Sequence, residues 1–446
     1  MVINMFGTDG IRGTANAGHI VAETLIRIGM ALGRVDPGNN RISVVIGKDT
    51  RLSGYMIEPA LTSGLVSVGV DPILVGPLPT PAIAMLTRSL RADFGVMITA
   101  SHNPFHDNGI KVFNKSGAKI CNTVQRRIED MVAGTEPIIL VEAKEFGRVR
   151  RLDDAQGRYI EHAKNTLAHG IRFDGMRIVL DCAHGAGYRV APTIFRELGA
   201  EVITLGCDPN GVNINKSVGA THSQTMRARV LLENADLGIA LDGDADRVII
   251  ADEQGALIDG DQILAVLAEQ WKLEGKLSRN GIVATEMSNH GLEHFLNSAG
   301  LELERAGVGD RSVAEKMRAG GYNLGGEQSG HIISGSQATT GDGITTALQV
   351  MQVIKKTGRS ASIACRKFTP TPQILHNVKI QDPDILDNAD VRNIIGEVEQ
   401  QLNGIARIMV RKSGTEPVVR IMGEGENSCA IRKSIDRIAG VIENAA

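Results

Sequence analysis

The sequence lacks the features that mark membrane-spanning, secreted and nucleic-acid-binding proteins. No run approaches the roughly 18 apolar residues of a membrane-spanning helix. The first twenty residues have neither the basic start nor the apolar stretch of a signal peptide, so we expect a cytoplasmic protein. The 48 basic and 51 acidic residues leave a net charge of −3, which gives no general attraction to nucleic acid or to an anionic membrane. Any anion-binding site must therefore be local.

Cysteines are also scarce, odd in number and scattered. No two of them have a Cys-x-x-Cys spacing, and the five positions are Cys121, Cys182, Cys207, Cys365 and Cys429. We therefore expect neither a disulfide framework nor a zinc site.

What the chain does contain is a pattern that occurs three times. Each repeat starts with a short β-branched strand and a helical stretch, and a glycine then leads into a second strand. These first strands and helices are expected at residues 42–46 and 53–68, 177–181 and 186–198, and 282–285 and 289–298. Further helical sequence, a short apolar strand and a polar loop complete each repeat. One βαβ-like module used three times would place three polar loops at a shared cleft.

A fourth segment breaks this pattern. Residues 368–372, Phe-Thr-Pro-Thr-Pro, cannot continue a helix and predict a linker. A small α+β domain is predicted beyond it, from strands at 376–380, 405–410 and 418–422 and helices at 391–402 and from 428. We therefore predict an α/β protein with four domains around a central cleft. Three similar α/β domains with mixed sheets are expected at 1–153, 154–256 and 257–368, and the smaller C-terminal α+β domain at 369–446.

The polar loop of the second repeat, Asp242-Gly243-Asp244-Ala245-Asp246-Arg247, gathers three carboxylates. It follows an apolar strand expected at 237–241, and α/β proteins bind ligands at the carboxyl ends of their strands. On a helix, side chains at i and i+2 would point to opposite sides, so an extended or tightly turned loop must bring the three together. Three hard oxygen ligands suit Mg²⁺.

The residues of this loop also allow two alternatives to a magnesium site. A calcium-binding EF-hand would use Glu253 at its twelfth position, but Arg247 stands where that loop needs glycine, and the flanks have the pattern of strands. A polar turn without a metal is disfavoured because three clustered carboxylates repel one another unless they are neutralised.

The polar loop of the first repeat, Thr99-Ala100-Ser101-His102-Asn103-Pro104, carries a candidate phosphoserine. A phosphate on Ser101 would bring a charge of about −1.5 to −2 to the magnesium site, and ion and phosphate would stabilise each other. Lys111 and Arg247 are available to bind phosphoryl oxygens and to screen the charge that accumulates during transfer. The alternative is a simple turn with an Asx-type hydrogen bond. His102 is adjacent to Ser101, which is poor geometry for a catalytic base.

Two other segments have local interpretations. Thr339-Thr340-Gly341-Asp342-Gly343 predicts the start of an apolar helix over 344–354, with Asp342 as its N-cap. Gly47-Lys48-Asp49-Thr50-Arg51 follows a strand and has residues that suit an anion, but it lacks the spacing of a nucleotide-binding P-loop.

The serine loop, the following Asn108-Gly109-Ile110-Lys111 and the Asp loop together resemble the α-D-phosphohexomutase superfamily, and the resemblance covers essentially the whole chain. It implies that Ser101 is phosphorylated. It also implies that the serine passes its phosphoryl group to a hexose phosphate through a sugar 1,6-bisphosphate, which is both intermediate and activator. Mg²⁺ is then expected on Ser101, Asp242, Asp244 and Asp246.

The same resemblance implies roles for further residues. Arg12, in the segment Gly7-Thr8-Asp9-Gly10-Ile11-Arg12-Gly13, and Lys111 are expected at the reacting hydroxyl, and Arg247 and His331 complete the catalytic set. The loop Glu327-Gln328-Ser329-Gly330-His331 resembles the family's sugar-binding loop. The sugar hydroxyls need both donors and acceptors, which Glu327, Ser329 and His331 supply.

A phosphate site is expected in the C-terminal domain, on the segment 411–417 and Arg420, which resembles the superfamily's fourth-domain site. Hydroxyls, a glycine that lets an anion approach the backbone, and arginines that bind oxygens in pairs suit a phosphate. The residues are Arg411, Ser413, Gly414, Thr415 and Arg420. The alternative is an exposed basic turn between two strands.

Within the superfamily, the start Phe6–Gly13 and the residues Gln328 and Gly330 favour a hexosamine phosphate as the substrate. A mutase of glucose or mannose phosphates is the nearer alternative. A non-catalytic protein that binds sugar phosphates is the more distant one, and the intact loops argue against it. The resemblance also allows a homodimer.

Overall fold

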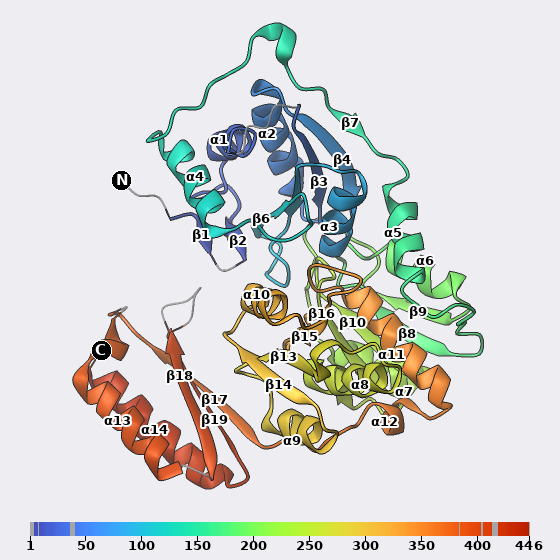
Figure 1. Ribbon diagram of the computed structural model, residues 1–446, viewed down its shortest axis with the longest axis vertical. Coiled ribbons are helices and arrows are strands. Elements are labelled where there is room, and N and C mark those ends of the chain that lie inside the picture. Colours follow the sequence, from blue (N-terminus) through green and yellow to red (C-terminus); the bar gives the residue numbers. More distant parts are fainter. Residues whose placement is uncertain are drawn as a thin grey trace. The chain divides into compact units, whose positions relative to one another are not determined.

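The computed structural model describes residues 4–7, 9–35, 41–382, 384–402, 405–412 and 418–445 (Figure 1). The chain forms two compact units. The first consists of residues 1–287 and 299–367, and the second of residues 288–298 and 368–446. None of the helices in the described part of the chain has the length and apolar character needed to cross a membrane.

The first sheet has seven strands in the order β1-β2-β6-β5-β3-β4-β7. Alternate side chains of residues 43–48, which form an inner strand of this sheet, face two different layers. Val44 and Ile46 share a core with apolar residues of α1, α2 and α4, whereas Gly47 lies against Ile83 of α3. The elements are β1 (Phe6–Gly7), β2 (Gly10–Thr14), α1 (Ala22–Leu32), β3 (Ser43–Lys48), α2 (Gly54–Ser67), β4 (Asp71–Pro77), α3 (Thr80–Ser89), β5 (Phe94–Ile98), β6 (Asp107–Asn114), α4 (Asn122–Ala133) and β7 (Arg150–Arg151).

The second sheet has five strands in the order β12-β11-β10-β8-β9. Its central strands are buried on both faces, and Val179 and Ala240 pack against Met226 and Val230 of α7. The elements are α5 (Ala155–Lys164), β8 (Arg177–Asp181), α6 (Val190–Glu197), β9 (Glu201–Leu205), α7 (Gln224–Glu233), β10 (Leu237–Leu241), β11 (Val248–Asp252) and β12 (Leu257–Ile258).

The third sheet has four strands in the order β14-β13-β15-β16. Val283 in its centre packs against Val313 and Met317 of α10. The elements of this part of the chain are α8 (Gly260–Leu273), β13 (Gly281–Thr285), α9 (His290–Ser298), β14 (Glu302–Ala306), α10 (Asp310–Gly320), β15 (Leu324–Gly326), β16 (Ile332–Ser334), α11 (Gly343–Thr357) and α12 (Ala361–Ala364).

The predicted threefold repeat is confirmed by the strand pairing. In each sheet, the first strand of the repeat pairs in parallel with the second and the third strands. The chain then passes through the polar loop and forms a fourth strand, which pairs antiparallel with the third. The parallel sets are β3 with β4 and β5, β8 with β9 and β10, and β13 with β14 and β15. The antiparallel pairs are β5 with β6, β10 with β11, and β15 with β16. The three polar loops therefore occupy equivalent positions, each directly after the third strand of its repeat.

One helix of the repeat begins later than expected. The sequence pattern predicts helix from residue 186, but α6 starts at Val190. The backbone N–H of Ala186 donates to the carbonyl oxygen of Gly243 in the Asp loop at 2.8 Å instead of joining a helix. At Gly185, a Cβ would lie 2.2 Å from the same carbonyl oxygen, so the glycine permits this close backbone packing.

The second unit contains the small antiparallel sheet β17-β19-β18 and two helices. Alternate apolar residues of the sheet, such as Val419 and Ile421, share a core with apolar residues of both helices. Helix α9 also belongs to this unit, and the His290 N–H donates to Glu424 in β19 at 2.8 Å. The elements are β17 (Gln373–Lys379), α13 (Ala389–Leu402), β18 (Ala406–Lys412), β19 (Val418–Gly425) and α14 (Ser428–Ala445).

Candidate active site

Ser101 lies in the polar loop after β5, in a left-handed backbone conformation with φ of 51°. Its side chain is buried, and its Oγ donates a hydrogen bond to Oδ2 of Asp242 at 2.7 Å. Nδ1 of His102 is 3.4 Å from the same Oγ. Burial lowers the pKa of His102 to about 4, with Arg247 and Arg12 adding to the effect, so the ring is neutral at pH 7. The structure thus joins the serine loop of the first domain to the Asp loop of the second.

Arg51 holds the serine loop in place, a role that sequence reasoning missed. The side chain is only 1% exposed, and all five N–H groups of its guanidinium have acceptors. One N–H donates to Asp49, and the other four donate to backbone carbonyl oxygens of Ser101, Asn103, Pro104 and Asp107. Arg51 belongs to the segment 47–51, whose residues suit an anion by their sequence. In the structure its guanidinium instead holds the backbone around Ser101 in place.

The Asp loop runs between β10 and β11, and its three aspartates are buried. One ligand oxygen from each of Asp242, Asp244 and Asp246 lies within 4.8 Å of the others, so one small cation can contact all three. Asp242 accepts from Ser101 and from the backbone N–H of Arg247. The Oδ1 atoms of Asp244 and Asp246 are buried and have no hydrogen-bond partner in the described part of the chain. Buried carboxylate oxygens without partners are what a site for Mg²⁺ requires.

The charge balance of this loop also fits a cation. Burial raises the pKa of Asp242 well above its ordinary value, and the nearby carboxylates of Asp246 and Asp244 raise it further. Three carboxylates at this spacing repel one another in a buried site. A divalent ion would relieve that repulsion. The EF-hand alternative does not hold in the structure, because Glu253 accepts hydrogen bonds from Ser362 instead of facing the loop.

Lys111 projects from β6 into the carboxylate cluster. Its Nζ is 2.8 Å from Oδ2 of Asp244 and 2.8 Å from Oδ2 of Asp246, and only 2% of the side chain is exposed. Burial alone would lower the pKa of Lys111, but the carboxylates outweigh burial and raise it well above the ordinary value. Each aspartate thus uses Oδ2 for the lysine, while its Oδ1 has no hydrogen-bond partner among the described residues.

Asp9 connects Lys111 to the two other cations at this edge of the site. It forms ion pairs with Arg12 and Lys119, and its Oδ2 is 3.3 Å from Nζ of Lys111. Burial would raise the pKa of Asp9, but the positive charges of Lys111, Lys119 and Arg12 hold it below its ordinary value. Asp9 was part of the motif that identified Arg12, yet no sequence signal indicated its contact with β6.

Arg247 and His331 both lie near Oδ1 of Asp246. Nε of Arg247 is 4.0 Å from Oδ1 of Asp246, and the side chain is partly exposed. The ring of His331 is buried, with Nδ1 3.6 Å from Oδ1 of Asp246. Nε2 of His331 accepts from the backbone N–H of Gly341 at 2.9 Å, so in the neutral form of the ring the proton lies on Nδ1. Burial would lower the pKa of His331, but the carboxylates of Asp246, Asp310 and Glu327 raise it above its ordinary value.

The expected sugar loop is a tight turn between β15 and β16. Its backbone N–H of Glu327 donates to the carbonyl oxygen of His331 at 3.1 Å. Oε1 of Glu327 accepts from the N–H of Gly309, just before α10, at 3.1 Å. Glu327 is partly buried, and Ser329 is exposed. Of the three residues expected to contact sugar, His331 is thus turned toward the Asp loop.

The phosphate-site residues expected in the C-terminal domain belong to the second unit. Arg411 in β18 and Arg420 in β19 are direct cross-strand partners, so their side chains leave the same face of the sheet. Ser413, Gly414 and Thr415 lie outside the described residues.

Comparison with known proteins identifies the family. Models of the phosphoglucomutase/phosphomannomutase family match four consecutive segments of the chain. The three alpha/beta/alpha domains match residues 4–137, 157–255 and 259–371, and the C-terminal domain matches residues 375–441.

Individual proteins agree with this match. A phosphoglucosamine mutase from Parvibaculum lavamentivorans is 55% identical over 442 residues, which is 99% of this chain and 99% of that protein. The structure of a phosphoglucomutase/phosphomannomutase family protein from Burkholderia thailandensis has a TM-score of 0.82 at 23% identity, and the match covers 99% of this chain and 97% of that one. An Aspergillus fumigatus N-acetylphosphoglucosamine mutase, solved with GlcNAc-6P and magnesium, has a TM-score of 0.69 at 18% identity and coverage of 99% and 96%. The two solved structures establish the fold, and the bacterial relative matches over its full length. The chain therefore belongs to the phosphoglucomutase/phosphomannomutase family of enzymes, the α-D-phosphohexomutases.

Proposed function

We propose that this enzyme interconverts glucosamine 6-phosphate and glucosamine 1-phosphate through a phosphorylated Ser101. The observation that carries the proposal is the hydrogen bond between Ser101 and Asp242 inside a buried cluster of three carboxylates. A serine beside a metal loop can hold a phosphoryl group between two transfers. The name of the full-length bacterial relative supports the amino sugar as the substrate.

We further propose that Asp242, Asp244 and Asp246 hold Mg²⁺ together with an oxygen on Ser101. The two unpartnered Oδ1 atoms support this assignment, as does the magnesium in the fungal mutase of the same fold. When bound, Mg²⁺ neutralises charge on the phosphoryl oxygens during transfer. Lys111, Arg12 and Arg247 surround the same loop and supply further positive charge for those oxygens.

The transfer has two balanced halves. In the first, the C1 hydroxyl oxygen of glucosamine 6-phosphate attacks phosphorus on phosphoserine 101. The new P–O bond forms as the bond between phosphorus and Oγ of Ser101 breaks, and the hydroxyl proton is released. After the 1,6-bisphosphate has turned over, Oγ attacks phosphorus at C6, and the C6 oxygen takes up a proton. The phosphate has then moved from C6 to C1, and Ser101 is phosphorylated again.

The remaining expected residues would bind the sugar and the phosphate that is not reacting. Glu327, Ser329 and His331 are proposed for the sugar hydroxyls. The phosphate would be held by Arg411, Ser413, Gly414, Thr415 and Arg420. A bisphosphate that escapes would leave Ser101 unphosphorylated, so added sugar 1,6-bisphosphate should act as an activator. We expect this chemistry in the cytoplasm.

The phosphoserine is tested by intact-mass measurement and turnover. Active enzyme should carry one phosphate-sized mass increment that is lost in Ser101→Ala, and turnover should fall at least about 10³-fold, or about 4 kcal/mol in barrier. Ser89→Ala, an exposed serine at the end of α3, is the matched control and should change neither. Active enzyme with an unmodified Ser101 and no response to added bisphosphate would contradict the mechanism.

The substrate is tested by coupled turnover on the 6-phosphates of glucosamine, N-acetylglucosamine, glucose and mannose. Glucosamine 6-phosphate should have the highest kcat/KM. A clear preference for mannose 6-phosphate would retain the phosphoserine chemistry and overturn the amino-sugar assignment.

A further inference from the structure

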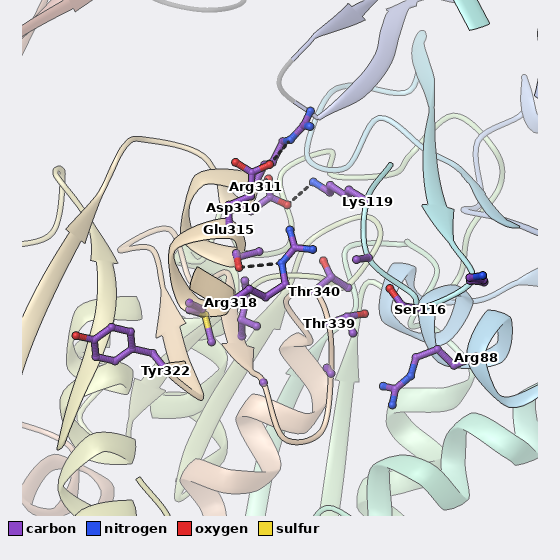
Figure 2. Close-up of a pocket in the computed structure, with 17 residues that line it drawn as sticks. Arg88, Ser116, Lys119, Asp310, Arg311, Glu315, Arg318, Tyr322, Thr339 and Thr340 are labelled. Carbon is purple, nitrogen blue, oxygen red and sulfur yellow. Dashed lines mark hydrogen bonds and ion pairs between the residues drawn. The ribbon is translucent and has the colours of Figure 1, made fainter. Parts of the chain in front are cut away.

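The first unit contains a cavity of about 570 Å³ between its first and third domains. One wall is formed by α3 and the hairpin of residues 115–119, and the other by α10 and the segment around Thr339. Figure 2 shows Arg88 and Ser116 on one side and Arg318 of α10 on the other. Among the described residues that line it, none belongs to the serine loop, the Asp loop or the sugar loop. The cavity is therefore separate from the proposed reaction site.

Positive charge dominates the lining of this cavity. Its charged residues are five basic and two acidic side chains, which are Arg88, Lys115, Lys119, Arg311, Arg318, Asp310 and Glu315. Lys119 pairs with Asp310, and Arg311 pairs with Glu315. For Arg88, Lys115 and Arg318, no carboxylate partner exists in the part of the chain that the structure describes. Three uncompensated cations around one cavity indicate an anionic occupant.

The rest of the lining is largely apolar. Ala314 and Met317 of α10, Ile333 of β16 and the ring of Tyr322 line the cavity beside the cations. Binding sites for small molecules typically have volumes of about 300–1,000 Å³ and combine such apolar walls with a few polar groups. The cavity is therefore much larger than a single phosphate ion needs, and its occupant should carry an apolar or planar part as well as negative charge.

We propose that this cavity binds a nucleoside diphosphate. The diphosphate would lie between the cations of the first domain, Arg88 and Lys115, and Arg318 of the third domain. The base would lie on the apolar wall that Met317 and Tyr322 help to form. Such a ligand would bridge two domains that contribute different loops to the reaction.

The cavity and the reaction site share one wall, which decides the choice of variants. Lys119 pairs with Asp310 and also with Asp9, which contacts Lys111. Changes at Lys119 or Asp310 would therefore disturb both sites. Lys115 and Arg318 are exposed and contact none of the proposed catalytic residues, so Lys115→Ala and Arg318→Ala test the cavity alone.

The experiment is calorimetric titration of the full chain with ADP and UDP. Pyrophosphate, which has the charge without the base, and adenosine, which has the base without the charge, serve as comparison probes. We expect one nucleoside diphosphate per chain, bound at least tenfold more tightly than either comparison probe. Lys115→Ala and Arg318→Ala should each weaken binding about tenfold, about 1.4 kcal/mol. Lys433→Ala, an exposed lysine on α14, is the matched control and should bind like the wild type.

Turnover without nucleotide should be unchanged in both cavity variants. Saturating glucosamine 6-phosphate should not displace the nucleoside diphosphate, because the two sites are separate. Displacement by the sugar phosphate, or full binding in both cavity variants, would place the nucleotide elsewhere and overturn the proposal. Absence of binding at millimolar concentrations of ADP and UDP would also overturn it. Pyrophosphate binding as tight as ADP binding would show an inorganic-anion site and refute the nucleotide class.

Discussion

At the scale of single residues, Arg51 shows how a buried charge can order a loop without taking part in chemistry. Four of its five guanidinium hydrogen bonds converge on the backbone that carries Ser101, and Asn215 adds another to the Ser101 carbonyl oxygen at 2.8 Å. Asp49 lies against the guanidinium and partly offsets its charge. The left-handed conformation of Ser101 is thus held by neighbours rather than by its own preference.

Arg51→Lys should therefore destabilise the protein and slow phosphoryl transfer. Lysine keeps the charge but has three donors in place of five, so at least two of the five acceptors lose the hydrogen bond from residue 51, at about 1–3 kcal/mol each. We expect a loss of about 2–5 kcal/mol in urea unfolding and a lower kcat. Arg158→Lys, at an exposed pair with Asp154, is the matched control and should have little effect. If Arg51→Lys unfolded at the same urea concentration as the wild type, the serine loop would not depend on the guanidinium hydrogen bonds of Arg51.

A second prediction at this scale concerns the metal. Asp244→Asn keeps the size of the side chain and removes one charge from the loop, so affinity for Mg²⁺ and turnover should fall together, each at least about tenfold. The unfolding midpoint measured without metal should change little, because repulsion among the aspartates is relieved. Calorimetry of Mg²⁺ binding measures the effect, with Asp236→Asn, at the exposed residue just before β10, as the control. Full turnover in excess chelator would contradict the assignment.

At the scale of elements, α11 begins as its sequence predicts, with Asp342 as the N-cap. The carboxylate accepts from the N–H groups of Ile344 and Thr345 at 3.1 and 3.0 Å. The hydroxyl of Tyr159 in α5 also donates to it, at 3.0 Å. The local sequence predicts the cap. It does not predict the contact with Tyr159, which is 183 residues away in the chain. Burial raises the pKa of Asp342 from 3.8 to about 6, against the effect of these hydrogen bonds.

This pKa gives a stability that depends on pH. Because the folded protein holds the Asp342 proton more tightly than the unfolded chain, the contribution is fully present below pH 3.8 and is lost as pH rises through about 6. Asp342→Asn keeps a cap acceptor but has no proton to lose. The free energy of unfolding of wild type relative to Asp342→Asn should therefore fall by up to about 3 kcal/mol between pH 4 and pH 7. Parallel curves over this range would show that Asp342 does not titrate there.

Strand and helix positions in the repeats followed the sequence closely where the pattern was local. The strands expected at 177–181 and 237–241 match β8 and β10 residue for residue. The later start of α6 has a tertiary cause, because Ala186 donates to Gly243 of the neighbouring loop. Local periodicity contains no information about such a partner.

At the scale of the whole molecule, the chain consists of two units, and the second is expected to act as a clamp on phosphate. Arg420 would bind the phosphate that is not transferred, both before and during the reaction. Arg420→Ala should therefore raise KM about tenfold or more, with less effect on kcat, and should increase the need for added bisphosphate because the intermediate escapes.

Kinetics with and without bisphosphate measure this effect. Arg420→Lys should recover only part of the loss, since lysine cannot bind two oxygens with a planar fork. Arg432→Ala, an exposed arginine on α14, is the matched control. A complete loss of kcat with normal KM and normal activator demand would instead indicate a direct role of Arg420 at the reacting centre.

The sequence by itself determined the repeat, the element types and the loops that carry Ser101 and the three aspartates. These depend on residues close together in the chain, through side-chain periodicity and the polar residues that follow each strand. Only the tertiary structure decided which groups meet. Ser101 bonds Asp242 across 141 positions, Lys111 lies between two aspartates more than 130 positions away, and Arg51 binds the serine loop some 50 positions on. Such contacts, and the cavity between the first and third domains, arise from domain packing. Burial brings charged side chains together from distant parts of the chain, and no regular spacing in the sequence indicates which of them will meet.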